Sequence, residues 1–200
     1  MASESTPRRS QILEAAERLF RHYGPGKTTV ADIARACGIG VGSVYLDFAS
    51  KEAIVDELTR ARTSRVAWRM RTSARAKAVP ERLVEALRAR IEELFELAAE
   101  GQHACDLVRC GRAGFDPDAR AYLVELLREG IDRGELAPGR PVPPEELVAS
   151  IELAFAALSP PEVFRFERAE ALAHADRLGA LVVWGLVAPE RRASSRRRVG

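Results

Sequence analysis

Three glycines lie within five residues, at Gly38, Gly40 and Gly42, in the stretch GIGVGSVYLDFASKE. Glycines ahead of a helix can bind phosphate, because the bare backbone approaches the ligand closely. A Walker loop needs Gly-Lys-Ser/Thr after a strand, and the residues from Gly38 to Ser43 include no lysine and follow no predicted strand. A dinucleotide loop needs Gly-x-Gly-x-x-Gly, a spacing that these glycines lack. The pattern instead favours a tight turn between two short helices.

Soft metal ligands form a second candidate group at His103, Cys105 and Cys110. On one helix the two cysteines would point roughly 140° apart, so they would share neither a metal ion nor a disulfide. The sequence has no His-Glu-x-x-His, no Gly-x-Ser-x-Gly and no spaced carboxylate pair. We therefore expect no catalytic residue, no metal and no cofactor. A cysteine-based redox or metal-responsive regulator and an all-α enzyme are the alternatives.

The elements around the glycines are predicted to be helices, because no segment sustains a period of two. Apolar residues at spacings of three and four predict a helix over residues 12–23. Thr28 or Thr29 is a plausible N-cap for a short helix that Gly38 ends. A second short helix is expected over residues 41–48.

Beyond Ser50, which precedes a longer helix, the pattern remains helical to about residue 187. The fold class is therefore all-α. We expect a three-helix unit over residues 1–50, a larger helical body over 51–188 and a basic, disordered tail over 189–200.

Charge is distributed unevenly along the chain, which carries +2 in total. Residues 1–79 hold 14 Lys and Arg against 8 acids, residues 80–188 hold 12 against 20, and residues 189–200 hold 5 against 1. A basic front and an acidic body indicate an anionic partner at one end. Three cysteines, the absence of an apolar leader and the absence of a long apolar run predict a cytoplasmic protein without a membrane span.

One set of residues over 10–58 carries a resemblance to a known family: Ile12-Leu13-x-Ala15-Ala16, Leu19-Phe20, Gly24, Thr28-Thr29-Val30, Ile33-Ala34, Cys37-Gly38-Ile39, Gly42-Ser43-Val44-Tyr45, Phe48 and Ser50-Lys51-Glu52. With these residues the segment resembles the N-terminal domain of the tetracycline-repressor (TetR) family. The resemblance implies a helix-turn-helix domain at residues 1–50 in a homodimeric transcription regulator. Such a regulator is usually a repressor that a small-molecule effector releases from a palindromic operator on double-stranded DNA.

The resemblance also implies which residues contact DNA, with the second short helix in the major groove. Those residues are Thr28, Thr29, Val41, Gly42, Ser43, Tyr45 and Lys51, with Arg8, Arg9 and Lys27 as further candidates. Asp47 departs from the family, which usually has tyrosine or histidine there. An acid at this position repels phosphate unless Lys51 or an arginine neutralises it. Alternatively, the acid accepts a hydrogen bond from a cytosine amino group.

The body is expected to provide an effector pocket and a dimer interface. The candidate pocket residues, on different predicted helices, are Trp68, Phe95, Cys105, Val108, Arg109, Phe115, Tyr122 and Phe155. The last two helices are expected to form the interface through small and bulky residues. Its candidate residues are Ala154, Leu158, Leu178, Val182 and Trp184, with Phe155, Ala157, Ala175, Gly179 and Gly185 beside them.

Overall fold

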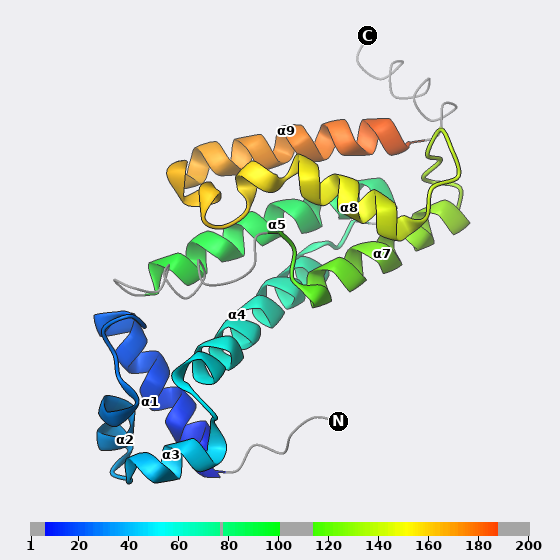
Figure 1. Ribbon diagram of the computed structural model, residues 1–200. Helices are drawn as coiled ribbons and strands as arrows, with labels where there is room; N and C mark the ends of the chain where they lie inside the picture. Colours follow the sequence, from blue (N-terminus) through cyan, green and yellow to red (C-terminus); the bar gives the residue numbers. More distant parts are fainter. Residues whose placement is uncertain (1–6, 77, 101–113, 188–200) are drawn as a thin grey trace. The chain divides into compact units, whose positions relative to one another are not determined.

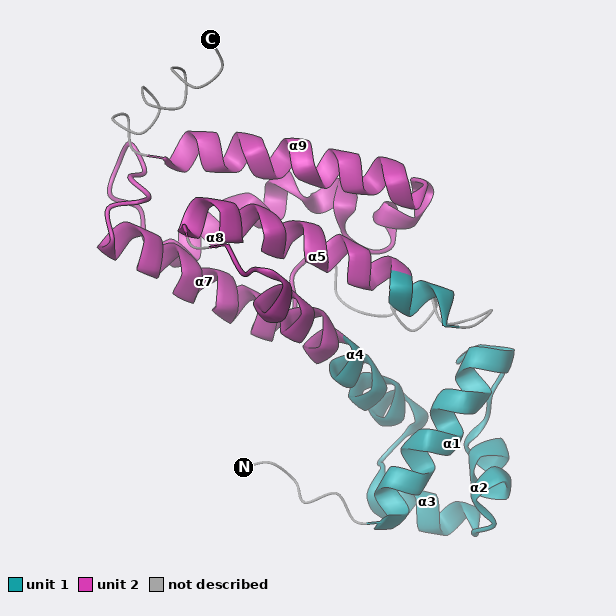
Figure 2. Cartoon of the chain, turned by 180° about the vertical axis from the view of Figure 1, so that it is seen from behind, with its two compact units in different colours: residues 1–62, 96–111 teal, residues 63–95, 112–200 magenta. Residues whose placement is uncertain are grey.

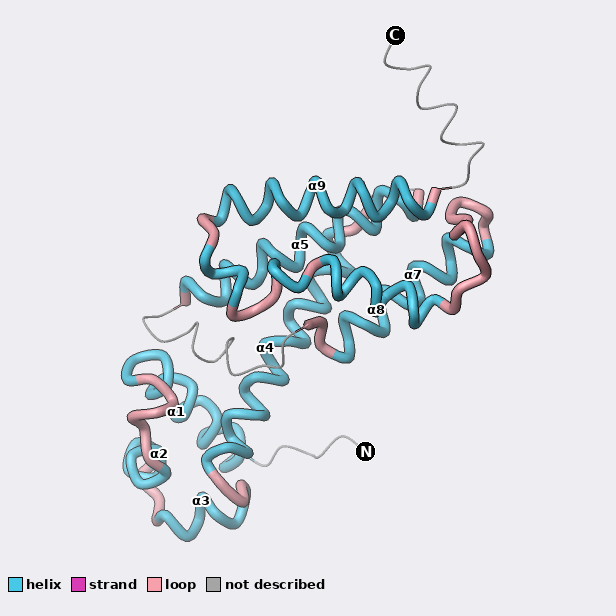
Figure 3. The backbone as a smooth tube through the Cα atoms, turned by 45° about the horizontal axis from the view of Figure 1, so that its top comes forward, coloured by secondary structure: helices cyan, strands magenta, loops and turns pink. Residues whose placement is uncertain are grey.

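The chain folds into helices joined by loops throughout residues 7–76, 78–100 and 114–187, which are those that the computed structural model describes (Figures 1 and 3). The all-α prediction is confirmed for this part of the chain. The α-helices are α1 (Pro7–Tyr23), α2 (Val30–Cys37), α3 (Val41–Asp47), α4 (Lys51–Ser73), α5 (Val79–Ala99), α7 (Pro117–Asp132), α8 (Pro144–Ala154) and α9 (Arg168–Leu186). Two short 3-10 helices, η1 (Ala156–Leu158) and η2 (Glu162–Arg165), lie between α8 and α9.

The chain divides into two compact units, which Figure 2 colours separately. Unit 1 comprises residues 1–62 and 96–111, and unit 2 comprises residues 63–95 and 112–200. Helix α4 begins in unit 1 and continues into unit 2.

The first turn of α2 shows how the sequence specifies local structure in unit 1. Thr29 is its N-cap, and the Thr29 hydroxyl accepts a hydrogen bond from the Asp32 backbone N–H at 3.2 Å. The Asp32 carboxylate accepts in return from the Thr29 backbone N–H at 3.0 Å. This reciprocal pair is a capping box, and it satisfies two N–H groups that a helix start would leave unpaired.

Apolar faces of α1, α2, α3 and α4 meet to form the core of unit 1. Since each of these helices buries only one stripe, the core forms only when all four are present. The buried residues of this core are Ile12, Ala15, Ala16, Phe20, Ile33, Ala34, Val44, Phe48, Ile54 and Leu58.

The buried apolar residues of unit 2 lie on α5, α7, α8, α9 and the second half of α4, and glycines allow close approach between them. A Cβ atom on Gly130 would lie 2.6 Å from the Leu136 Cδ1 atom, so α7 can pack against this loop residue only without a side chain there. On α7 the buried stripe includes Leu123, Leu126 and Leu127, whereas Val124 and Ile131 are only half-buried.

Among the described residues, no helix combines the length and apolar character that crossing a membrane requires.

Candidate nucleic-acid interface

The turn between α2 and α3 depends on Gly38, which adopts a left-handed conformation with φ of 68°. A Cβ atom is strained in this conformation, so the backbone requires glycine at this position. The backbone N–H of Ile39 donates to the carbonyl oxygen of Ala34 at 3.1 Å and closes the last turn of α2. The chain then enters α3 after Gly40, its N-cap residue. This is the helix-turn-helix arrangement that the sequence predicted.

Helix α3 has one buried face and one exposed face. Val44, and Phe48 directly after the helix, pack into the core of unit 1. Val41, Tyr45 and Leu46 are 41%, 52% and 77% exposed. Large apolar and aromatic side chains gathered on one short helix indicate a surface with a partner other than water. The exposed face of α3 consists of Val41, Gly42, Tyr45 and Leu46.

Gly40 and Gly42 have no role in packing within the described residues. A Cβ atom at either position would meet no atom within 4 Å. Neither residue has the positive φ that favours glycine. Their missing side chains leave the start of α3 open to close approach by a partner's backbone or bases.

Two of the expected DNA contacts, Thr28 and Lys51, are engaged inside unit 1. Thr28 is 2% exposed, and its hydroxyl donates to the carbonyl oxygen of Gly24 at 2.9 Å. The structure therefore corrects the expectation for Thr28, because burial keeps its side chain from DNA. The Lys51 ammonium donates to the carbonyl oxygens of Pro25 at 2.9 Å and Thr28 at 3.2 Å. Lys51 thus joins the start of α4 to the loop before α2.

The remaining predicted DNA contacts lie at the surface of unit 1. Ser43 is half-buried in the first turn of α3, and Thr29 is exposed at the start of α2. Asp47 at the end of α3 is bonded to Arg8, at 2.5 Å between Arg8 Nε and Asp47 Oδ2. An arginine therefore neutralises Asp47, and Lys51 is bonded elsewhere.

Not all of the residues predicted to line the effector pocket are buried. Trp68 is 62% exposed on α4, which corrects its assignment to an interior pocket, since one apolar stripe cannot cover every side of a helix. Phe115, Tyr122 and Phe155 are buried, and Phe95 is half-buried with its ring 5.7 Å from that of Phe164. The predicted residues Cys105, Val108 and Arg109 lie outside the described residues, as do His103 and Cys110.

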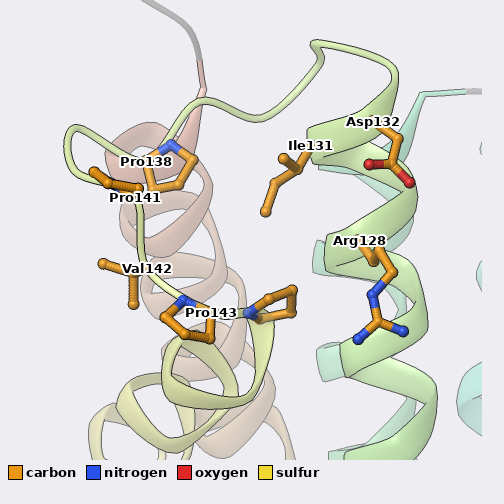
Figure 4. Close-up of a pocket in the computed structure, with 8 residues that line it drawn as sticks. Arg128, Ile131, Asp132, Pro138, Pro141, Val142 and Pro143 are labelled. Carbon is orange, nitrogen blue, oxygen red and sulfur yellow. The ribbon is translucent and has the colours of Figure 1, made fainter.

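A hollow of about 490 Å³ lies where α7 is followed by the loop to α8 (Figure 4). Its residues come from the end of α7 and from a proline-rich segment, and none of them was predicted from the sequence. The lining residues are Arg128, Ile131, Asp132, Pro138, Pro141, Val142, Pro143 and Pro144.

Sequence reasoning missed Arg90, a buried cation in unit 2 that is 2% exposed. Its guanidinium donates to the carbonyl oxygens of Leu158 and Gly114, both at 3.0 Å, and to the Ser159 hydroxyl at 3.2 Å. The guanidinium carbon also lies 4.6 Å from the centre of the Phe115 ring. Burial lowers the pKa of Arg90 to about 10, so it stays charged at neutral pH. The available signal was its spacing on α5, three residues after Leu87 and seven after Leu83, which places Arg90 on the same buried face.

The residues predicted for a dimer interface separate into buried and exposed groups. Leu158 is 1% exposed and belongs to the core of its own unit, which corrects its assignment to the interface. Ala175 and Gly179 are also buried, and a Cβ atom on Gly179 would lie 3.4 Å from Val84 of α5. Leu153 and Ala154 of α8 and Leu181 and Trp184 of α9 are exposed, whereas Leu178 and Val182 are half-buried.

Comparison with known proteins identifies the same N-terminal segment. The family model described as "Bacterial regulatory proteins, tetR family" matches residues 12–58, which include α2 and α3. The HTH-type transcriptional repressor KstR2 of Mycobacterium tuberculosis is 34% identical over 151 residues, covering 69% of this chain and 74% of that protein. The HTH-type transcriptional regulator TtgR of Pseudomonas putida is 44% identical over 55 residues, covering 28% of this chain and 26% of that protein.

A solved structure shows that the likeness in fold extends beyond the N-terminal segment to most of the chain. The fatty acid degradation regulator FadR from Bacillus halodurans superposes with a TM-score of 0.61 at 20% identity, covering 92% of this chain and 98% of that one. The chain therefore belongs to the tetR family of bacterial regulatory proteins and is a DNA-binding transcriptional regulator, not an enzyme.

Proposed function

We propose that the chain is a homodimeric repressor, located in the cytoplasm, which binds a palindromic operator and leaves it when a small molecule binds unit 2. The observation that carries this proposal is the exposed face of α3, with Val41, Tyr45 and Leu46 all exposed on a short helix. Val44 and Phe48 anchor the opposite face of α3 in the core of unit 1, so the exposed face is already formed before DNA binds.

The side chains of α3 are proposed to contact different parts of the DNA, according to their chemistry. Val41 contacts a thymine methyl group, and Ser43 donates or accepts at a base edge or a phosphate. Tyr45 donates its phenolic hydroxyl to a phosphate oxygen. Thr29, whose own hydroxyl donates to Asp32, lies beside the phosphate backbone at the start of α2. Gly42 allows the first turn of α3 to enter the major groove closely.

A symmetric dimer through α8 and α9 gives this small domain enough affinity to regulate. Leu153, Leu181 and Trp184 are 79%, 68% and 47% exposed on these two helices, and Ala154 beside Leu153 permits close approach. Two copies of such a pair of helices form a four-helix interface with twofold symmetry. Twofold symmetry in the protein requires a palindromic site, whose half-sites lie about 34 Å apart or at a multiple of that distance.

The effector binds in unit 2 among aromatic side chains. Phe95, Phe115, Tyr122 and Phe155 are the described aromatic candidates, and Tyr122 supplies a hydroxyl that can orient a ligand. A ligand that binds more tightly to a dimer with mismatched α3 spacing shifts the population away from the operator-bound form.

The proposal is tested by selecting bound fragments from random DNA with the full-length protein, followed by footprinting and titration at several salt concentrations. We expect enrichment of a palindrome, one dimer per site and affinity that falls steeply with salt. Compounds are then screened for release of that fragment. Failure to enrich any site, or enrichment of sites without twofold symmetry, would sink the proposal.

A further inference from the structure

Asp47, the last residue of α3, places a carboxylate at the end of the helix that is proposed to enter the DNA groove. A carboxylate exposed there would repel the phosphates of the backbone. Its side chain is only 10% exposed, however, and its Oδ2 atom accepts from Arg8 Nε at 2.5 Å. The Asp47 carboxylate is therefore bonded to an arginine of α1, and little of its surface is left to contact a base or a phosphate.

A second arginine joins the same two segments. The Arg9 Nη1 atom donates to the backbone carbonyl oxygen of Asp47 at 2.5 Å. Its guanidinium carbon lies 4.1 Å from the centre of the Phe48 ring, and Glu57 of α4 accepts from its Nη2 atom. The first turn of α1 is thus fixed to the end of α3 through both arginines.

The two arginines differ in how far they reach solvent. The Arg8 side chain is 45% exposed, whereas that of Arg9 is 22% exposed and lies between Phe48 and Glu57. A guanidinium carries five N–H donors, and the bond to Asp47 uses the one on Nε. The bond also raises the pKa of Arg8 and lowers the pKa of Asp47, which keeps both groups charged. Arg8 therefore presents a charged, oriented group beside the end of α3.

We propose that Asp47 is a positioning residue for DNA binding, which orients the exposed guanidinium of Arg8 so that it binds a backbone phosphate next to the groove that α3 occupies. This inference rests on the proposed function, since it needs α3 to face DNA. According to this inference Asp47 strengthens DNA binding, although DNA repels its negative charge. The decisive measurement is therefore whether DNA affinity falls or rises when that charge is removed.

The experiment is a double-mutant cycle on the full chain with Asp47→Asn, Arg8→Gln and both together, using a DNA fragment that the wild-type protein binds. Arg165→Gln is the matched control, because Arg165 is 78% exposed in unit 2 and also pairs with an acid, Glu162. Thermal unfolding of each variant shows whether it is folded. Affinity is measured across a range of salt concentrations.

We expect Asp47→Asn to weaken binding about two- to thirtyfold, as for an ion pair lost in each of two half-sites. In the Arg8→Gln background the same change has no effect or tightens binding, because only the repulsive charge is then removed. Arg8→Gln also reduces the slope of log affinity against log salt by about 0.9 per phosphate contact, and Arg165→Gln leaves it unchanged.

Two outcomes overturn the inference. If Asp47→Asn alone tightens DNA binding, the acid only repels DNA. If Asp47→Asn lowers the affinity equally with Arg8 and with Gln at position 8, Asp47 acts on DNA by itself, for example by accepting a hydrogen bond from a cytosine amino group. Failure of the proposed function gives a different result. In that case the wild-type protein binds no DNA site, and Tyr45→Ala does not change its DNA affinity.

Discussion

The ammonium group of Lys51 donates a hydrogen bond to the backbone carbonyl oxygen of Pro25 at 2.9 Å, across 26 residues of sequence. The same group donates to the carbonyl oxygen of Thr28 at 3.2 Å. The loop between α1 and α2 is therefore fixed to the first turn of α4 by a cation that satisfies two backbone acceptors. A hydrogen bond from a charged donor contributes more to stability than one between neutral groups.

Replacing Lys51 by methionine keeps the aliphatic stem and removes both bonds, so we expect a loss of about 1–2 kcal/mol in the free energy of unfolding. Urea unfolding of the full chain measures this. Lys27→Met is the control, since Lys27 is exposed in the same loop and its replacement should change stability by less than about 0.5 kcal/mol. Equal effects of the two variants would contradict the role of Lys51. A salt slope of DNA binding that is unchanged by Lys51→Met would assign Lys51 to the fold alone.

The two glycines Gly38 and Gly42 are expected to respond oppositely to alanine. Gly38 has φ of 68°, so Gly38→Ala strains the turn and costs about 1–2 kcal/mol of stability. Gly42 is helical with open space around its missing Cβ, so Gly42→Ala keeps or slightly raises stability. DNA affinity, however, falls with Gly42→Ala, because a methyl group now stands between α3 and the groove. Stability from urea unfolding and affinity from fluorescence titration are compared for both variants. A Gly42→Ala protein with unchanged affinity would show that close approach at this residue is not needed.

The capping box at the start of α2 makes part of the stability of unit 1 depend on pH. Hydrogen bonds from the hydroxyl and backbone N–H of Thr29 hold the pKa of Asp32 below its usual value. Because the folded pKa lies below the unfolded one, this stabilisation is complete above the unfolded pKa of about 4. It is lost as the pH falls through the lower folded value.

We expect Thr29→Ala to cost about 1 kcal/mol at pH 7, the usual effect of losing an N-cap. The difference in unfolding free energy between wild type and Asp32→Asn should shrink as the pH is lowered from 6 toward 3. Arg35→Gln measures the smaller share of this effect that comes from Arg35, which contacts Asp32 from an exposed position at 3.1 Å and also lowers its pKa, but takes no part in the cap. A difference that stays constant over this range would exclude the carboxylate as the source.

The helix-turn-helix could be predicted from the sequence because local signals determine most of it. Gly38 ends α2 through its own backbone, and Thr29 caps the same helix with a residue three positions away. The exposed positions of α3 follow from the helical period once Val44 and Phe48 are placed in the core. No contact distant in sequence is needed for any of these steps.

Other residues could not be predicted, because their partners are distant in sequence. Periodicity gives the face of a helix that is apolar, but it does not say whether this chain or a second molecule covers that face. Periodicity therefore predicts Leu158 and Gly179 in a dimer interface, although both are buried within their own unit. The Arg8 partner of Asp47 lies 39 residues away, whereas helical spacing suggested Lys51.

Exposed apolar side chains of α8 and α9 form the interface of the proposed dimer. Leu181 is 68% exposed on α9, so Leu181→Glu disturbs the core of unit 2 little. We expect it to convert the proposed dimer into a folded monomer, because a carboxylate buried against its own symmetry mate is repelled and desolvated. Light scattering after size-exclusion chromatography measures the mass.

Leu158→Ala is the matched control, because Leu158 is buried in the same unit. Its truncation leaves a cavity and costs about 2–5 kcal/mol without entering an interface. At a temperature where this variant stays folded, it should still form dimers, and Leu181→Glu should not. DNA affinity should fall sharply in Leu181→Glu alone, since one monomer reads only one half-site. If both variants form dimers, the interface does not include Leu181 of α9. If both are monomers, Leu158 also belongs to the interface.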